Sequence, residues 1–230
     1  DITYFMRSGW LQSPAHLSVF WLGDQLQTFD EFDGLQSCLT GALSSGLGGH
    51  SLTHSDIGGY NAYNGGPDMT YIRTPELLMR WSEMGAFGFT LFRTHIGSST
   101  STDVPQIYSS VQLMQHFAKF ASIFGNLSTY RIELMQEAQE HGYPLIRQMS
   151  LQYYYDTHVR SLTSQFMMGD EVLVAPVLYS DSNFTFVYIP ASSGTWIHLV
   201  GYNKCVPIDL LSALLCLNCV LIDAYSGLEI

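Results

Sequence analysis

Apolar residues in the first part of the chain occur in short unbroken runs that alternate with longer stretches of helical spacing. Residues 2–6 and 18–22 are continuous apolar runs, which is the pattern of strands covered on both faces. Residues 51–56 and 89–95 are expected to form a third and a fourth strand. Strands that alternate with helical stretches predict parallel βα units.

Three stretches between and after these runs carry helix signals. Residues 30–49 have acidic residues at the start and glycines at the end, as expected for a helix. Thr74 and Pro75 predict an N-cap followed by proline at the first helical position. Residues 108–142 are expected to hold one or two helices that end at Gly142.

The pattern changes after Pro144. Residues 145–155, 164–179 and 183–200 are strand-like and rich in β-branched and aromatic side chains, which predicts an appended β-sandwich. Residues 210–222 form an apolar run that is too short to span a bilayer. We therefore expect an α/β fold: a barrel part over residues 1–147, a β-sandwich over 148–200, and a divergent apolar tail of unassigned role over 201–230.

Charged side chains gather at the carboxyl ends of the predicted strands. In a (β/α)₈ barrel this end of the strands is the catalytic face. Buried charges without partners are costly, so core packing alone does not explain the pattern. The residues are Arg7, Asp24, Asp56, Arg93 and His95.

Composition narrows the possible partners. The formal net charge is −11, with only nine Lys and Arg, so binding to nucleic acid or to an anionic membrane surface is not expected. Cys216 and Cys219 have zinc-ligand spacing, but no second pair completes a site. We therefore expect no metal and no cofactor, and a small molecule as the partner. His50, His54 and His116 are expected to be structural.

Asp24 and Asp56 suggest glycoside hydrolysis, which requires an acid at the leaving oxygen and a second carboxylate at the reacting carbon. The alternative for a single Asp before a turn is a capping role. Charged donors for sugar hydroxyls would be Arg7, Arg93 and His95. Trp21 and Tyr60 would form walls of the pocket.

Five ordered motifs between residues 2 and 200 resemble glycoside hydrolase family 31, the α-glucosidase clan. They are FMRSGW, FWLGDQ, GALSSGLGGHSLTHSDIGGY, ELLMRWSEMGAFGFTLFRTH and GDEVLVAPVL. The resemblance implies a retaining α-glycosidase, with the C-terminal half of a TIM barrel followed by the β-sandwich.

The resemblance also implies a role for individual residues. Asp24 matches the general acid/base, whereas Asp56 matches a sugar-binding residue and no longer a nucleophile. The other matches to sugar-binding positions are Arg7, Tyr60, Arg93 and His95, with Trp21 and Gln25 beside Asp24. The family's nucleophile lies upstream of residue 1, so we expect this chain to be a fragment that is inactive alone.

Within the family, Gln25, Thr94 and Tyr60 are similar to the sulfoquinovosidase subgroup, which releases a sulfonated sugar. In that subgroup the tyrosine that matches Tyr60 helps to bind the sulfonate. The alternatives are an ordinary α-glucosidase and an inactive sugar-binding fragment. Sequons at Asn126 and Asn183 allow a secretory or lysosomal compartment, a cytoplasmic one is equally compatible, and the oligomeric state is open.

Overall fold

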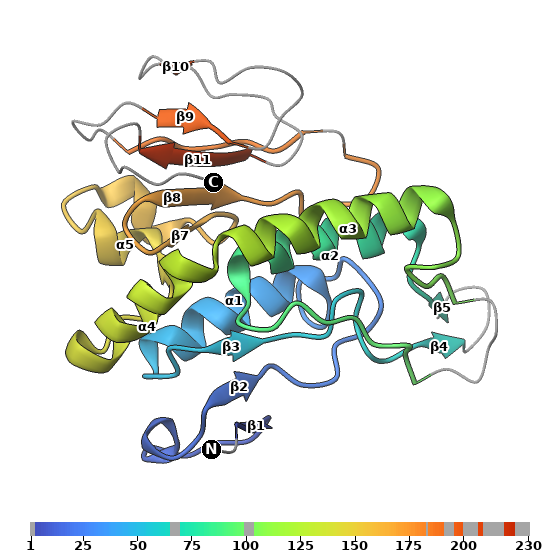
Figure 1. The fold of residues 1–230 in the computed structure, drawn as a ribbon, viewed down its shortest axis with the longest axis horizontal. Coiled ribbons are helices and arrows are strands. Elements are labelled where there is room, and N and C mark those ends of the chain that lie inside the picture. Colours follow the sequence, from blue (N-terminus) through green and yellow to red (C-terminus); the bar gives the residue numbers. More distant parts are fainter. Residues whose placement is uncertain are drawn as a thin grey trace.

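The computed structural model describes residues 3–64, 70–98, 104–182, 184–190, 196–199, 207–208 and 219–223. The side chains of Cys216 and Cys219 and the second sequon asparagine, Asn183, lie outside these residues. Three layers make up the described fold: parallel strands, helices, and an antiparallel sheet on the other side of the helices (Figure 1). Within the described ranges, no helix combines the length and the apolar character needed to cross a membrane.

Three parallel strands form the first layer. Strands β1 (Phe5–Met6), β2 (Val19–Trp21) and β3 (Thr53–His54) are ordered β1-β2-β3. Each lies within a segment that was predicted as a strand, over residues 2–6, 18–22 and 51–56, and the pairing is parallel throughout. Consecutive parallel strands joined through a helix are the repeating unit of a (β/α)₈ barrel.

The prediction of a fourth strand over residues 89–95 is wrong. This segment runs beside β3 but makes only an isolated bridge, between Ile57 and Thr94. The Leu91 carbonyl accepts from the ring of His54, at 3.2 Å, and the His95 carbonyl accepts from Arg73, at 2.7 Å. Among the described residues, only two backbone hydrogen bonds join the segment to β3 and the residues after it, from Thr90 N to the Thr53 carbonyl and from Ile57 N to the Arg93 carbonyl, and these do not make a regular ladder.

Four helices form the middle layer: α1 (Leu35–Leu47), α2 (Pro75–Gly88), α3 (Val111–Asn126) and α4 (Ser128–His141). The predicted start of α2 is confirmed, because the Thr74 hydroxyl accepts from the backbone of Leu77. The predicted end of α4 at Gly142 is also confirmed. Gly142 has a φ of 76°, the left-handed conformation in which glycine commonly ends a helix.

A six-stranded antiparallel sheet forms the third layer, in the order β10-β9-β11-β8-β7-β6. Its strands are β6 (Ile146–Gln148), β7 (Phe166–Met168), β8 (Val172–Ala175), β9 (Trp196–His198), β10 (Pro207–Ile208) and β11 (Cys219–Asp223). Smaller elements are the 3-10 turns η1 (Ser13–Ala15) and η2 (Thr157–Ser161), the short helix α5 (Met149–Gln152), and the hairpin of β4 (Tyr63–Asn64) and β5 (Thr70–Tyr71).

Strand pairing divides the chain differently from the expected domain boundaries. The sheet begins at Ile146, inside the segment assigned to the barrel, and the strand-like residues 149–152 are helical. The expected tail contributes β11, which lies between β8 and β9. Its buried Val220 and Leu221 belong to different core clusters, since successive strand residues face opposite sides of a sheet.

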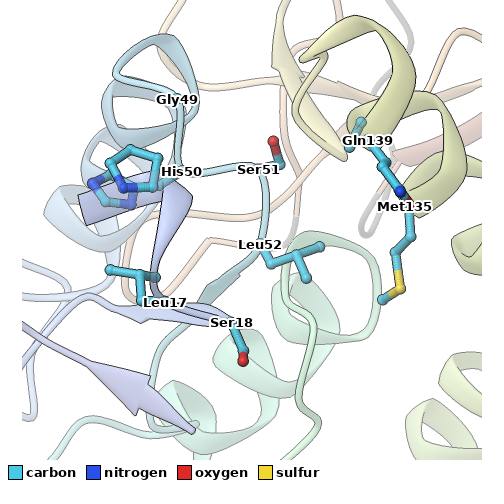
Figure 2. Close-up of a pocket in the computed structure, with 10 residues that line it drawn as sticks. Leu17, Ser18, Gly49, His50, Ser51, Leu52, Met135 and Gln139 are labelled. Atoms are coloured by element: carbon cyan, nitrogen blue, oxygen red, sulfur yellow. The ribbon is translucent and has the colours of Figure 1, made fainter. Parts of the chain in front are cut away.

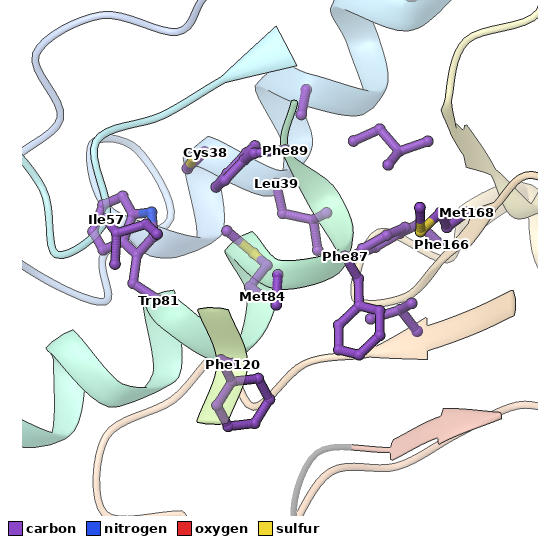
Figure 3. Close-up of a cluster of buried hydrophobic side chains, with 14 of the residues drawn as sticks. Cys38, Leu39, Ile57, Trp81, Met84, Phe87, Phe89, Phe120, Phe166 and Met168 are labelled. Atoms are coloured by element: carbon purple, nitrogen blue, oxygen red, sulfur yellow. The ribbon is translucent and has the colours of Figure 1, made fainter. Parts of the chain in front are cut away.

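One large apolar cluster joins the layers. Figure 3 shows side chains of α2, such as Trp81, Met84 and Phe87, packed with Leu39 of α1 and Phe166 of the antiparallel sheet. Each fully buried side chain of this size contributes about 1.5–3 kcal/mol relative to exposure. The cluster therefore fixes the parallel strands and the loops that follow them relative to the sheet.

Candidate active site

Asp24 and Arg7 meet at the ends of neighbouring strands. Asp24 follows β2 after Gly23, whose φ of 96° turns the chain out of the strand. Arg7 follows β1, and its Nη1 lies 2.8 Å from Asp24 Oδ2. The guanidinium also lies 5.8 Å from the centre of the Trp21 ring. Both charged side chains remain accessible, with 56% of Arg7 and 29% of Asp24 exposed, as a site for a soluble substrate requires.

Hydrogen bonds of the Asn61 and Gln25 side chains hold the turn that carries Asp24. Asn61 Nδ2 donates to the Asp24 carbonyl at 2.8 Å. Gln25 is only 8% exposed; its Nε2 donates to the Leu22 carbonyl at 2.6 Å, and its Oε1 accepts from the Ser55 hydroxyl at 3.2 Å. In the structure Gln25 thus orders the turn around Asp24. Direct contact between Gln25 and a substrate stays a prediction.

A second charged pair lies at the end of β3. Asp56 is 1% exposed, and its Oδ1 accepts from Arg93 Nη1 at 2.8 Å. His54 Nε2 lies 3.4 Å from the same oxygen. Asp56 Oδ2 is buried and has no hydrogen-bond partner among the described residues. An unsatisfied buried acceptor is unfavourable, and this oxygen keeps the capacity to accept a further hydrogen bond.

Tyr60 and His95 form an aromatic pair at the same end of the strands. Their ring centres lie 4.5 Å apart, with the planes tilted by 52°. His95 Nδ1 accepts from the backbone N–H of Gly97 at 3.0 Å. The neutral ring therefore carries its proton on Nε2 and can donate from that atom.

The structure thus groups the predicted residues into three neighbouring sets. Arg7, Trp21 and Asp24 form the first, Asp56 with Arg93 the second, and Tyr60 with His95 the third. Gly59 N donates to the Asp56 carbonyl, and Tyr60 N to that of Gln25. These short connections hold the three sets at the carboxyl end of the parallel strands.

Sequence reasoning missed the contribution of His54, which was expected to be a structural strand residue. It is fully buried in β3, and its ring touches both Asp56 and Arg93. The spacing held a signal, because His54 and Asp56 are two residues apart in an extended segment and so share a face. Asn61, Gln27 and Arg73 carried no comparable signal.

A separate cavity of about 210 Å³ opens near the amino ends of β2 and β3 and is lined by Leu17, Ser18, His50, Leu52 and Met135 among others (Figure 2). The His50 ring stacks on Phe20 with centres 4.4 Å apart, and burial lowers the pKa of His50. None of the predicted site residues lines this cavity. In barrels this face serves stability, whereas the opposite face is catalytic.

Comparison with known proteins places these residues in a family. The family model for the glycosyl hydrolases family 31 TIM-barrel domain matches residues 2–137, and that for the family 31 C-terminal domain matches residues 142–210. The chain is 37% identical over 199 residues to a sulfoquinovosidase of Agrobacterium fabrum, covering 86% of this chain. It is 30% identical over 212 residues to human neutral alpha-glucosidase AB, also covering 86% of this chain.

Among solved structures, a family 31 sulfoquinovosidase from E. rectale in complex with an aza-sugar inhibitor is similar over 99% of this chain, with a TM-score of 0.84 and 32% identity. This chain spans 33% of that protein, 29% of the Agrobacterium protein and 21% of the human one. The described fold is part of the family's TIM barrel followed by its C-terminal sheet domain. The chain belongs to glycosyl hydrolase family 31.

Proposed function

We propose that this chain supplies the general acid/base and part of the sugar-binding site of a retaining α-glycoside hydrolase that acts on sulfoquinovosides. The observation that carries the proposal is the accessible Asp24, held at a strand end by Arg7 at 2.8 Å. The second pair joins the buried Asp56 to Arg93, whose side chain is 42% exposed and can offer N–H groups to sugar hydroxyls. Family membership is consistent with hydrolysis of glycosyl bonds.

In the proposed mechanism Asp24 first protonates the glycosidic oxygen as the bond to the sugar breaks. It later removes a proton from the water that releases the sugar from the enzyme. Arg7 orients the Asp24 carboxylate and keeps further N–H groups available for sugar hydroxyls. Asp56 and His95 offer an acceptor and a donor that fix the sugar ring.

A retaining reaction also needs a carboxylate nucleophile. Asp56 is not assigned that role, because its Oδ1 is paired with Arg93 and the family resemblance matches it to a sugar-binding position. The resemblance to the family assigns the nucleophile to a barrel strand before residue 1. We therefore propose that turnover requires an upstream barrel half, and that the chain alone is inactive.

The proposed substrate follows from Gln25, Thr94 and Tyr60, the residues that are similar to the sulfoquinovosidase subgroup. The identity of 37% to the Agrobacterium fabrum sulfoquinovosidase supports this choice. Similarity to human neutral alpha-glucosidase AB favours an ordinary α-glucosidase as the second candidate. The third candidate is an inactive sugar-binding fragment.

The test uses a chimera, called here the completed barrel, in which this chain replaces the matching part of the Agrobacterium fabrum sulfoquinovosidase. We expect it to hydrolyse an aryl α-sulfoquinovoside faster than the aryl α-glucoside. Asp24→Asn should lower turnover by about 10²-fold or more. Asp170→Asn, at an exposed turn of the sheet, is the matched control and should retain activity.

Several results would contradict the proposal. Turnover by Asp24→Asn at the parental rate would exclude the acid/base role. Faster hydrolysis of the glucoside would favour the α-glucosidase. Calorimetry of the chain alone with sulfoquinovose tests the third candidate: binding by a chain whose completed barrel is inactive would favour a sugar-binding fragment.

A further inference from the structure

Arg73 is a buried cation that no part of the proposed mechanism uses. It lies between β5 and α2 and is 1% exposed. Its Nε donates to the Pro105 carbonyl at 2.6 Å, its Nη1 to the His95 carbonyl at 2.7 Å, and its Nη2 to Gln106 Oε1 at 2.6 Å. Burial lowers the pKa of Arg73 to about 10. The guanidinium thus joins the two ends of the segment from His95 to Gln106.

The backbone of Arg73 contacts a different part of the site. Its N–H donates to Gln27 Oε1 at 3.0 Å, and Gln27 Nε2 reaches the Tyr60 carbonyl at 3.5 Å. Gln27 is almost fully buried, so its amide serves these protein contacts. Arg73 is therefore bonded to the turn after Asp24 as well as to the segment that follows His95.

The loop that leads to Tyr60 passes closely over Arg73. Gly58 has a φ of 90°, and a Cβ built on it would lie 3.0 Å from Arg73 Nη1 and 2.8 Å from Leu78 Cδ1. Both the backbone conformation and the space require glycine here. This close contact fixes the distance between the Gly58 backbone and the Arg73 guanidinium.

The two loops above Arg73 are also bonded to each other. Ser98 N donates to the Tyr60 carbonyl at 2.8 Å, and Gly97 N donates to the His95 ring at 3.0 Å. The Tyr60 and His95 rings, whose centres lie 4.5 Å apart, belong to the residues that make these bonds. The position of the ring pair therefore depends on the segment that Arg73 holds.

We propose that Arg73 is a positioning residue that fixes the Tyr60–His95 pair by bonding the carbonyl oxygens of the loop after His95. Its effect on sugar binding rests on the proposed function, whereas its effect on the loop does not. Arg73 acts through the backbone and does not itself touch the substrate.

The test on the chain itself is amide hydrogen exchange at Gly97 and Ser98. Arg73→Met removes the donors and keeps the apolar stem, and it should raise exchange at both amides by roughly tenfold or more, because local opening controls their protection. Arg73→Lys, which keeps one donor group, should give a smaller increase. Arg131→Met is the control, since Arg131 is a buried arginine bonded to carbonyls of Phe124 and Ala86 among the helices.

Equal protection of Gly97 and Ser98 in Arg73→Met and in the parent would overturn the proposal. So would an increase in Arg131→Met as large as in Arg73→Met. Should Arg73→Met not fold, Arg73→Lys decides, because it keeps the positive charge but lacks the planar fork that bonds the Pro105 carbonyl, the His95 carbonyl and Gln106 Oε1 at once. We expect it to raise exchange at the same two amides, and unchanged exchange there would overturn the proposal.

In the completed barrel, a double-mutant cycle connects Arg73 to His95. If Arg73 acts through His95, the loss in kcat/KM caused by Arg73→Lys should nearly disappear in the His95→Ala background. An equal loss in both backgrounds would show that Arg73 does not act through His95. A completed barrel that is inactive before any substitution would contradict the proposed function, while the exchange result would still decide the role of Arg73 in the loop.

Discussion

Each charged residue at the proposed site is paired with a residue from a neighbouring strand or segment. Arg7 pairs with Asp24, and Arg93 with Asp56. Pairing of this kind lowers the free-energy cost of holding charges near a protein interior. It also fixes the directions of the carboxylates before a substrate arrives, so that little reorganisation is needed at the moment of reaction.

Behind Asp56 lies the buried thiol of Cys38. Burial raises the pKa of Cys38 to about 12, an effect that the neighbouring Ser55 hydroxyl opposes and the charge of Asp56 reinforces. The neutral thiol therefore packs beside Asp56 without adding a second negative charge. The unfolded chain does not impose this environment, so the protonation of Cys38 differs between the folded and unfolded states.

This difference predicts a pH dependence of stability. Between pH 9.0, the ordinary thiol value, and pH 12 the unfolded chain releases a proton that the folded chain retains. The contribution to stability is thus complete below pH 9.0 and is lost as pH rises toward 12. Urea unfolding at pH 9.5 to 10.5 should show a fall steeper by about 1.4 kcal/mol per pH unit in the parent than in Cys38→Ala. Parallel slopes would exclude this environment for Cys38.

Residue positions were predictable from sequence where they depend on the strand period. Asp24 follows an apolar run and Asp56 ends a short predicted strand, so their place at the strand ends could be predicted. The roles of Gln25 and Arg73 could not, because they are set by partners distant in the chain. Arg73 bonds the carbonyl of His95, 22 residues away, and the side chain of Gln106, 33 residues away.

Among the elements, β11 shows how a segment without a predicted role can be central to the fold. It pairs with β8 on one side and β9 on the other. Leu221 is fully buried in the second apolar cluster, with Leu173 and Trp196. The antiparallel sheet therefore depends on residues beyond the segment that its sequence pattern indicated.

Leu221→Ala should destabilise the chain by about 2–5 kcal/mol, because it leaves a cavity beside Leu173 and Trp196. Leu47→Ala is the matched control, since Leu47 is 58% exposed at the end of α1. Its effect should stay within roughly 0.5 kcal/mol. Urea unfolding followed by circular dichroism measures both. An equal change in the two variants would show that Leu221 does not pack as described.

The helices were predicted better than the strands. Thr74–Pro75 and Gly142 are local signals, and they fixed one end each of α2 and α4. The segment over residues 89–95 has the composition of a strand but, within the described structure, makes only two backbone hydrogen bonds to the β3 segment, and side chains of His54 and Arg73 bond two of its carbonyls. β11 could not be placed, because its apolar run has no period that distinguishes a strand from a buried helix.

At the scale of the whole molecule, the parallel sheet has an open edge. β1 pairs only with β2 among the described strands, and its Phe5 and Met6 are 40% and 50% exposed. Trp10 and Leu11, which follow β1, are exposed as well. An exposed apolar edge strand favours association with other chains. In the proposed enzyme an upstream barrel half covers this edge.

The proposed active site is therefore shared between this chain and an upstream half. The chain contributes Asp24, Arg7 and the polar groups around Asp56. The upstream half would contribute the nucleophile and the remaining walls of the pocket. The completed barrel is consequently the form in which the role of Asp24 can be tested directly.

The central measurement is rescue of Asp24→Ala by azide in the completed barrel, with an aryl α-glycoside that carries an activated leaving group. Such a substrate needs little acid assistance, and azide attacks the glycosyl enzyme without a general base. We predict that Asp24→Ala lowers turnover by about 10²-fold or more, and that azide restores it with formation of an α-glycosyl azide. Asp56→Ala, the control, should lose activity without rescue. Turnover of Asp24→Ala that azide leaves unchanged would contradict the assignment of Asp24 as the general acid/base.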